Sequence, residues 1–368
     1  MQVFLLALGS RGDIELFLTL GNELSRRGHG VTMGVCSFQR AMVEEAGLRS
    51  VEVATGAQAE LVEVFRSLER ISDKVERTRQ YVRSWLLPKL KQARALVAAH
   101  AGHCDYFISN LQLQMEKNGR PLPSASIIYD PPIVAPGATK PTQSAGHVLI
   151  LAATNKGLVD PKSEWDPSIL FTGFWHRKQV ASPKEEIKQF LSAGDPPVVL
   201  TMGSLATFNS KELLHKFSDA LTMTGKRGIV LCGWTWQAAA QRSTDTMLVA
   251  ENVPYEWLFP QACVVIHHGA YGAVAESARA GVPSILLPQI AAQEKFAEML
   301  AREKLSAATF ESSDVSADTL AKAIVMATTD SQIRNACLDW KSRIGGEQGV
   351  ELAVNLVEQH WQQFATNT

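Results

Sequence analysis

Short apolar stretches alternate with amphipathic ones along most of the chain, and most apolar stretches end at a glycine or a polar turn. Near the N-terminus, apolar segments at 2–8, 31–36 and 50–53 are separated by two stretches with helical periodicity. A second alternation of the same kind runs from residue 198 to residue 287. A βαβ alternation predicts a parallel sheet covered by helices. Two such alternations predict two α/β halves, with ligands bound beyond the carboxyl ends of the strands.

Length and composition exclude several classes of protein. The 368 residues are enough for two domains of roughly 100–200 residues each. The 36 basic against 37 acidic residues give a net charge of -1, which disfavours nucleic acid as a partner. Five scattered cysteines without a CxxC pair support neither a disulfide framework nor a zinc site. The apolar N-terminus stops at Gly9 without a basic region before it, so we expect a cytoplasmic protein without stable membrane insertion.

The strongest local feature is the sequence HHGAYGA at residues 267–273, between an apolar strand and an amphipathic helix. A helix N-terminus presents unpaired N–H groups and a partial positive charge, which suit a phosphate group. Gly269 and Gly272 allow close approach of a ligand, and His268 can add a hydrogen bond to a phosphoryl oxygen. The alternative is that His267 and His268 only close the strand and bond the loop main chain.

Two other turns follow predicted strands. In GSRGD at residues 9–13, Ser10 and Arg11 can bond an anion, and Asp13 begins a helix, where simple N-capping is the alternative role. This turn lacks the third glycine of a dinucleotide fingerprint, which disfavours a nicotinamide enzyme. In MGS at residues 202–204, Ser204 can bond a phosphate, with an ordinary turn serine as the alternative.

Taken together, these segments resemble the GT-B nucleotide-sugar glycosyltransferases, specifically the group of bacterial natural-product and sterol glucosyltransferases. The resemblance covers most of the chain and rests on five motifs in the family's order. They are GSRGD at 9–13, FTGFW at 171–175, MGS at 202–204, VPYEWLFP at 253–260 and HHG at 267–269.

The resemblance implies two Rossmann-like domains with a cleft between them. We expect an acceptor-binding domain at 1–178, a donor-binding domain at 179–346 and a helix at 347–368 that crosses back to the first domain. It also implies inverting, metal-independent transfer from a nucleotide sugar, without a cofactor, by a monomer or homodimer. UDP is favoured as the nucleotide and dTDP is possible.

The family's functional residues match positions throughout this chain. Asp13 matches the catalytic base. The diphosphate contacts correspond to Ser10, Arg11, Ser204, His268, Gly269, Gly272 and Ala273. The nucleoside contacts correspond to Val253, Pro254 and Glu276, and the sugar contact to Gln293.

The sequence departs from the family at two places. In the phosphate turn, Ala270, Tyr271 and Ala273 replace a glycine, an alanine and a threonine, so one hydroxyl is lost and a bulky ring enters the turn. Ala292 replaces the Asp that normally accepts hydrogen bonds from sugar hydroxyls. A charge-assisted hydrogen bond of this kind contributes ~1.5–3 kcal/mol. We therefore hypothesise a deoxysugar or otherwise atypical donor.

The acceptor is less defined than the donor, because the N-terminal half is short for the family. We expect a small-molecule acceptor, either lipid-like or a secondary metabolite, that is glycosylated on a hydroxyl. Two alternatives remain: a catalytically silent family member that acts as a binding protein, and a nucleotide-sugar 2-epimerase.

Overall fold

The computed structural model divides into two compact units, each built on a parallel sheet. The first unit contains Met1–Val64, Arg79–His176 and Glu347–Thr368, and the second contains Phe65–Thr78 and Arg177–Gly346. Segment 65–78 therefore groups with the second unit, although the sequence predicts one uninterrupted domain up to residue 178. The structure describes residues 1–111, 113, 115–130, 147–159, 168–178, 182–203, 210–233, 243–251, 253–311 and 314–365.

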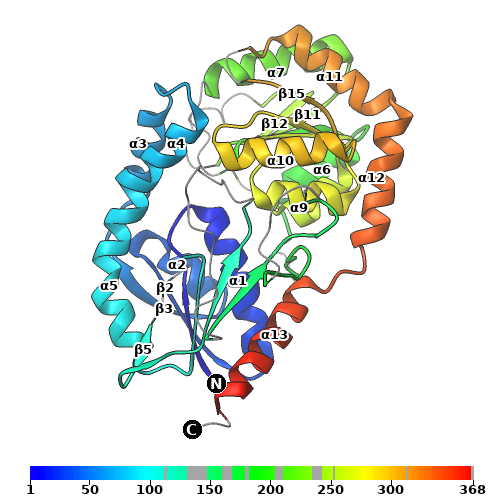
Figure 1. The fold of residues 1–368 in the computed structure, drawn as a ribbon. Coiled ribbons are helices and arrows are strands. Elements are labelled where there is room, and N and C mark those ends of the chain that lie inside the picture. Colours follow the sequence, from blue (N-terminus) through cyan, green and yellow to red (C-terminus); the bar gives the residue numbers. More distant parts are fainter. Residues whose placement is uncertain are drawn as a thin grey trace. The chain divides into compact units, whose positions relative to one another are not determined.

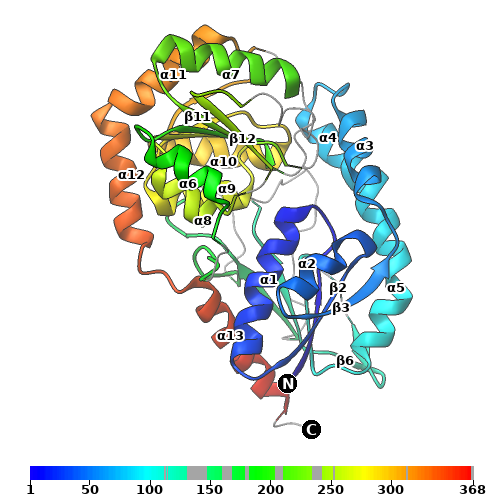
Figure 2. The same cartoon turned by 180° about the vertical axis from the view of Figure 1, so that it is seen from behind.

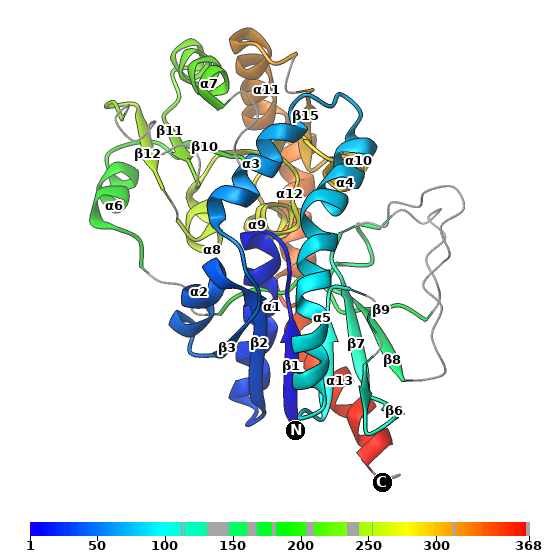
Figure 3. The ribbon, with the colours of Figure 1, turned by 90° about the vertical axis from the view of Figure 1, so that its left-hand side faces the viewer.

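The main sheet of the first unit has seven parallel strands in the order β3-β2-β1-β4-β7-β8-β9. Helix α5 covers one face of this sheet, and α1 and α13 lie beside each other over the other face (Figures 2 and 3). The strands are β1 Gln2–Leu6, β2 Gly30–Cys36, β3 Arg49–Ala54, β4 Tyr106–Ser109, β7 Ser124–Ile128, β8 Val148–Ala152 and β9 Leu170–Phe171, and a separate hairpin joins β5 Glu116–Lys117 to β6 Arg120–Pro121. The helices are α1 Arg11–Arg26, α2 Arg40–Glu45, α5 Leu87–Ala101 and α13 Gly349–Ala365, with a π-helical turn at Val82–Leu86 and a 3-10 turn at Ser37–Gln39.

The second unit has six parallel strands in the order β12-β11-β10-β13-β14-β15. Helices α7 and α11 cover one face, and α6, α9 and α10 the other (Figure 1). The strands are β10 Val198–Thr201, β11 Gly228–Leu231, β12 Met247–Ala250, β13 Val264–His267, β14 Ser284–Leu286 and β15 Ser306–Thr309. The helices are α6 Glu185–Ser192, α7 Ser210–Thr224, α8 Tyr255–Leu258, α9 Tyr271–Ala280, α10 Ala291–Arg302, α11 Ala317–Thr329 and α12 Ser331–Ile344, with a 3-10 turn at Phe259–Gln261.

Both sheets are buried on two faces, as their nearly continuous apolar strands require. In the second unit, one core packs α7 and α11 on the sheet, and another packs α6, α8 and α9 on the opposite face. The predicted α/β class with two parallel-sheet halves is confirmed. Helices α3 (Gln58–Leu68) and α4 (Lys74–Tyr81) contain the two points at which the chain passes between the units.

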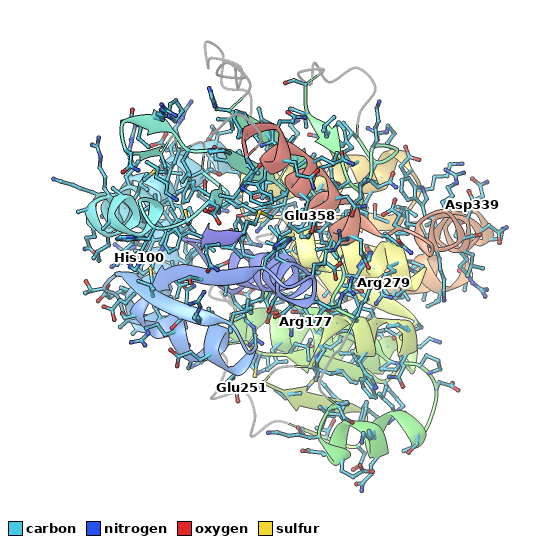
Figure 4. All side chains as sticks on the ribbon, turned by 90° about the horizontal axis from the view of Figure 1, so that it is seen from below. His100, Arg177, Glu251, Arg279, Asp339 and Glu358 are labelled. Carbon is cyan, nitrogen blue, oxygen red and sulfur yellow. The ribbon has the colours of Figure 1, made fainter. Side chains whose placement is uncertain are left out.

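The last helix, α13, is fixed to the first unit by ion pairs. Glu358, which is labelled in Figure 4, accepts hydrogen bonds from Arg27 Nη1 at 3.0 Å and contacts His29 Nε2 at 2.7 Å. Arg27 Nη2 also donates to the main-chain oxygen of Glu351 at 3.0 Å. These contacts hold the C-terminal helix against the end of α1. No helix among the described residues is long and apolar enough to cross a membrane.

Candidate functional site

The ends of β10 and β13 bring two predicted motifs together in the second unit. Thr201 pairs with His267 in register, so the turns after both strands leave the same edge of the sheet. A Cβ atom on Gly203 would lie 2.8 Å from the His268 ring, and Gly203 has a φ of +71°. Only glycine fits that conformation and that contact without strain. The adjacent Ser204, a predicted phosphate contact, lies outside the described residues.

His267 has a structural role in this turn. It is fully buried, its Nδ1 accepts a hydrogen bond from Gly269 N at 3.1 Å, and its Nε2 lies 3.0 Å from Ser284 Oγ. Because Nδ1 is the acceptor, the ring proton is on Nε2 and is donated to Ser284. Burial lowers the pKa of His267 to about 3. His267 therefore shapes the turn as a neutral ring.

His268 is a neutral imidazole with one open nitrogen. Burial lowers its pKa to about 4, and a hydrogen bond from the ring to the Thr201 main chain opposes part of that shift. Its Nδ1 is buried and has no hydrogen-bond partner within the described part of the chain. The nitrogen that donates to Thr201 must then be Nε2, so Nδ1 is an unused acceptor.

The first turn of α9 leaves one position uncovered. Gly272 is exposed, and a Cβ atom added there would meet no atom within 4 Å. Its neighbours Tyr271 and Ala273 are buried, so the tyrosine ring that distinguishes this turn packs inside the protein. Gly269 N and Ala273 N donate to His267 Nδ1 and to Ala270 O, respectively. These two predicted phosphate contacts thus donate within the protein, whereas Gly272 offers an uncovered helix N-terminus.

The turn before α10 holds the predicted sugar contact. Gln293 Oε1 accepts hydrogen bonds from Gln289 N at 2.8 Å and from Ile290 N at 3.3 Å, which caps the helix. The main-chain oxygen of Gln293 would lie 3.0 Å from a Cβ atom on Gly269, so this turn packs on the phosphate turn. The side-chain oxygen of Gln293 is thus used to cap the helix. Its side-chain nitrogen, Nε2, is the group suited to a sugar. Ala292 is buried beside it.

Glu276, the predicted ribose contact, is buried and paired with Arg279. Arg279 Nε and Nη2 lie 2.9 Å and 2.8 Å from Glu276 Oε2. Burial and the nearby charge of Glu276 raise the pKa of Glu256, whereas Arg177 and Arg279 oppose that shift (Figure 4). A compact group of two acids and two arginines therefore surrounds the predicted nucleoside position. Sequence motifs indicated only Glu276 among the four.

Val253 and Pro254, the other predicted nucleoside contacts, precede α8. Val253 is in the core with Phe259, and Pro254 is the N-cap of α8. The next residue, Tyr255, places its hydroxyl 2.9 Å from Thr201 Oγ1. The VPYEWLFP segment is thereby tied to the end of β10, next to the strand that leads to His268.

In the first unit, Asp13 folds back onto the turn that precedes α1. Its Oδ2 accepts hydrogen bonds from Ser10 N at 2.6 Å and from Ser10 Oγ at 3.0 Å. A Cβ atom on Gly9 would lie 2.3 Å from the same oxygen, which explains the glycine. The N-cap is thus Ser10, not Asp13 as weighed from the sequence, and Asp13 at N3 bonds back to the main chain of Ser10 as in a capping box. Arg11, a predicted anion contact, pairs with Glu15 at 3.1 Å.

The second carboxylate oxygen of Asp13 faces two residues that the sequence motifs did not select. Asp13 Oδ1 accepts a short hydrogen bond from the Tyr129 hydroxyl, which accepts one from Asn110 Nδ2 at 2.9 Å. The three residues follow β1, β4 and β7, which are neighbours in the sheet. Burial raises the pKa of Asp13, and the bonds from Tyr129 and Ser10 partly oppose that effect. A proton-accepting carboxylate at neutral pH is consistent with this environment.

Segment 65–78 is docked on the second unit beside the predicted sugar contact. Lys74 is buried, and its Nζ lies 3.1 Å from Glu294 Oε1 and also contacts Glu311. Arg77 Nη1 donates to the main-chain oxygen of Gln289 at 3.0 Å. The segment thus contacts both ends of the turn that carries Ala292 and Gln293. No motif in the sequence indicated this docking.

Comparison with known proteins shows what this chain is similar to. Residues 3–102 match the profile of the Glycosyltransferase family 28 N-terminal domain. The chain is 25% identical to O-mycaminosyltylonolide 6-deoxyallosyltransferase of Streptomyces fradiae, over 100% of this chain and 99% of that protein. It is also 25% identical to a sterol 3-beta-glucosyltransferase of Saccharomyces cerevisiae, where the match covers 96% of this chain and 34% of the longer relative.

Solved structures show the same architecture. Glycosyltransferase SnogD from Streptomyces nogalater has a TM-score of 0.71 at 18% identity and matches 98% of this chain and 99% of its own. Glycosyltransferase VinC, solved in complex with dTDP, has a TM-score of 0.68 at 17% identity and matches 99% and 100% of the two chains. The predicted GT-B fold and the resemblance to natural-product and sterol glycosyltransferases are confirmed. No group of three or more potential metal ligands occurs among the residues that the structure describes.

Replacing Lys74 by Met is expected to release segment 65–78 from the second unit. A hydrogen bond to a charged group contributes about 1.5–3 kcal/mol, less when its partners are half-exposed as Glu294 and Glu311 are, so we expect local opening to increase about fivefold or more. Trypsin cleavage at Arg70 and Arg77, followed by mass spectrometry, measures this opening. Lys322→Met, which removes an exposed pair with Asp318, is the control. Equal cleavage of both variants would contradict the docking role of Lys74.

Proposed function

We propose that this chain, a glycosyltransferase of the GT-B fold with a family 28 N-terminal domain, transfers a deoxysugar from a nucleoside diphosphate to an acceptor hydroxyl. We propose inverting, metal-independent transfer to a lipid-like or secondary-metabolite acceptor. The observation that carries the proposal is the unpartnered Nδ1 of His268, in the turn that leads into the exposed first turn of α9.

The diphosphate would be bound chiefly by dipoles. The first turn of α9 offers main-chain N–H groups at Gly272, and the positive end of the helix favours an anion there. His268, once it is protonated at Nδ1, would donate a hydrogen bond to a phosphoryl oxygen. The same groups would stabilise the negative charge that develops on the leaving diphosphate as the glycosidic bond breaks. Two similar solved structures contain thymidine diphosphate (dTDP), which supports a nucleoside diphosphate as the ligand class.

Ala292 supports a deoxysugar over a fully hydroxylated hexose. An apolar methyl group at this buried position cannot accept a hydrogen bond from a sugar hydroxyl. A hydroxyl placed against it would lose its water partners, whereas a deoxy position would not. The Streptomyces fradiae relative is named as a 6-deoxyallosyltransferase, which supports the same class of donor. The Gln293 amide would then bond one of the remaining hydroxyls.

Asp13 is the proposed base of the transfer step. It would take the proton of the acceptor hydroxyl while that oxygen attacks the anomeric carbon, and the diphosphate would leave with the electron pair of the broken bond. Its raised pKa makes it a stronger proton acceptor than an exposed carboxylate. Attack from the face opposite the leaving group inverts the anomeric configuration.

The central test combines calorimetry with product analysis. We expect UDP or dTDP to bind, and mass spectrometry to find a glycosylated product in a panel of deoxysugar nucleotides and hydroxyl-bearing acceptors. Asp13→Asn should lower kcat by about 10²–10⁴-fold, the range for a lost general base, without changing nucleotide affinity. Nucleotide binding without any product would favour the silent-member alternative. Absence of binding to UDP, dTDP and GDP would contradict the proposal.

Gly272→Leu tests the uncovered turn of α9 directly. A side chain there meets open space, and Leu is a better helix former than Gly, so the melting temperature should be unchanged or slightly higher. The same side chain would cover the phosphate position and weaken nucleotide binding about tenfold or more, which is a loss of about 1.4 kcal/mol or more. Gly346→Leu, at another exposed and open glycine of the second unit, is the control. Wild-type affinity in Gly272→Leu would place the phosphate elsewhere.

We expect His268 to take up a proton when the nucleotide binds. In the free protein Nδ1 carries no proton, because the pKa of His268 is lowered to about 4. A bound phosphate raises that pKa, so the complex holds more protons than the free protein, and this contribution to affinity grows as the pH falls toward the raised pKa. His268→Asn supplies a permanent amide donor and should bind without this uptake. Calorimetry in buffers of different ionisation enthalpy measures the difference, and equal uptake by both proteins would contradict it.

A further inference from the structure

Three adjacent strand ends of the first unit carry a chain of hydrogen bonds that ends at Asp13. Asn110 Nδ2 donates to the Tyr129 hydroxyl at 2.9 Å, and that hydroxyl donates to Asp13 Oδ1. An amide nitrogen can only donate, so the tyrosine oxygen is the acceptor in the first bond. The single phenol proton is then committed to Asp13. Asn110 therefore fixes the direction in which Tyr129 donates.

The Asp13 carboxylate is held at three of its acceptor positions. Ser10 N and Ser10 Oγ donate to Oδ2, and Tyr129 donates to Oδ1. A carboxylate has about four acceptor positions in all. The remaining one is on Oδ1, next to the Tyr129 hydroxyl. Both side chains are partly exposed.

The hydrogen bond from Tyr129 affects the pKa of Asp13 strongly because the neighbouring titratable groups do not stabilise its negative charge. Burial raises the pKa of Asp13, and the bond from Tyr129 is the largest effect that lowers it. The other titratable groups that act on this cluster are Asp130, which follows Tyr129, and Tyr81, which interacts with Asp13, Asp130 and Cys36. These neighbours bring no positive charge to the cluster. The neutral donors Tyr129 and Ser10, together with the main-chain N–H of Asp13, therefore stabilise the ionised form of Asp13.

We propose that Tyr129, oriented by Asn110, is the positioning residue that holds Asp13 ionised and leaves one acceptor position of Oδ1 for the hydroxyl of the acceptor. The proposal rests on the assignment of Asp13 as the base. In the transfer step, the acceptor O–H proton moves to Oδ1, and the Tyr129 proton stays on its own oxygen. Tyr129 thus forms and breaks no covalent bond. It acts by keeping Asp13 in the protonation state and orientation that the step needs.

Tyr129→Phe tests this proposal by its effect on the pH profile. Loss of a bond that favours the ionised carboxylate raises the pKa of Asp13, so the acidic limb of kcat/KM should move to higher pH. We also expect kcat to fall by up to about 100-fold, because the carboxylate loses its orientation, with donor KM unchanged. Asn110→Ala should move the acidic limb in the same direction by a smaller amount.

Tyr106→Phe is the matched control. Tyr106 is another buried tyrosine of the same sheet, at the opposite end of β4, and its hydroxyl contacts His360 Nδ1 at 2.6 Å and Ser124 O at 3.2 Å. This variant should lose stability but keep the wild-type pH profile. An unchanged pH profile and kcat in Tyr129→Phe would overturn the proposal. If Asp13→Asn retains full turnover, the base assignment itself fails, and this outcome is separate from the behaviour of Tyr129.

Discussion

The parallel pairing of neighbouring strands is the constraint on which every candidate functional group depends. Because β10 and β13 run in the same direction and pair Thr201 with His267, the turns after them emerge together. The same holds in the first unit, where the ends of β1, β4 and β7 place both Asp13 and Asn110 within hydrogen-bond distance of Tyr129. Residues more than 100 positions apart thereby form one group. The sheets are thus the scaffold, and the turns carry the chemistry.

Neutral groups dominate both halves of the candidate machinery. His268 is an uncharged ring, the α9 turn offers main-chain N–H groups, and Asp13 is held by hydroxyl and amide donors. In the free protein these donors are already oriented and carry no positive charge, and His268 becomes charged only when it takes up a proton on nucleotide binding. This accounts for a chain with a net charge of -1 whose proposed ligand is a diphosphate.

Local sequence predicted the groups that lie next to their partners in the chain. The alternation of apolar and amphipathic stretches predicted both sheets, and the glycine-bearing turns pointed to Asp13 and His268. The sequence did not predict Tyr129 or Lys74 as parts of these sites, because their contacts depend on tertiary packing. It also did not predict that Arg279 pairs with Glu276, because a helical side chain has several neighbours with which it can pair. The sugar contact of Gln293 stays a prediction, and its side-chain oxygen caps α10, which the sequence did not indicate. The assignment of Ser204 to the diphosphate stays a prediction.

The docking of segment 65–78 has a consequence for hybrid enzymes. A chimera could be joined at a single crossover near residue 177, where the chain enters the second unit and stays in it until residue 346. Here such a crossover would combine Lys74 and Arg77 from one parent with the Glu294, Glu311 and Gln289 positions of the other. The second unit is therefore built from two separate segments of the sequence. A chimera that exchanges this unit has to take both segments from the same parent.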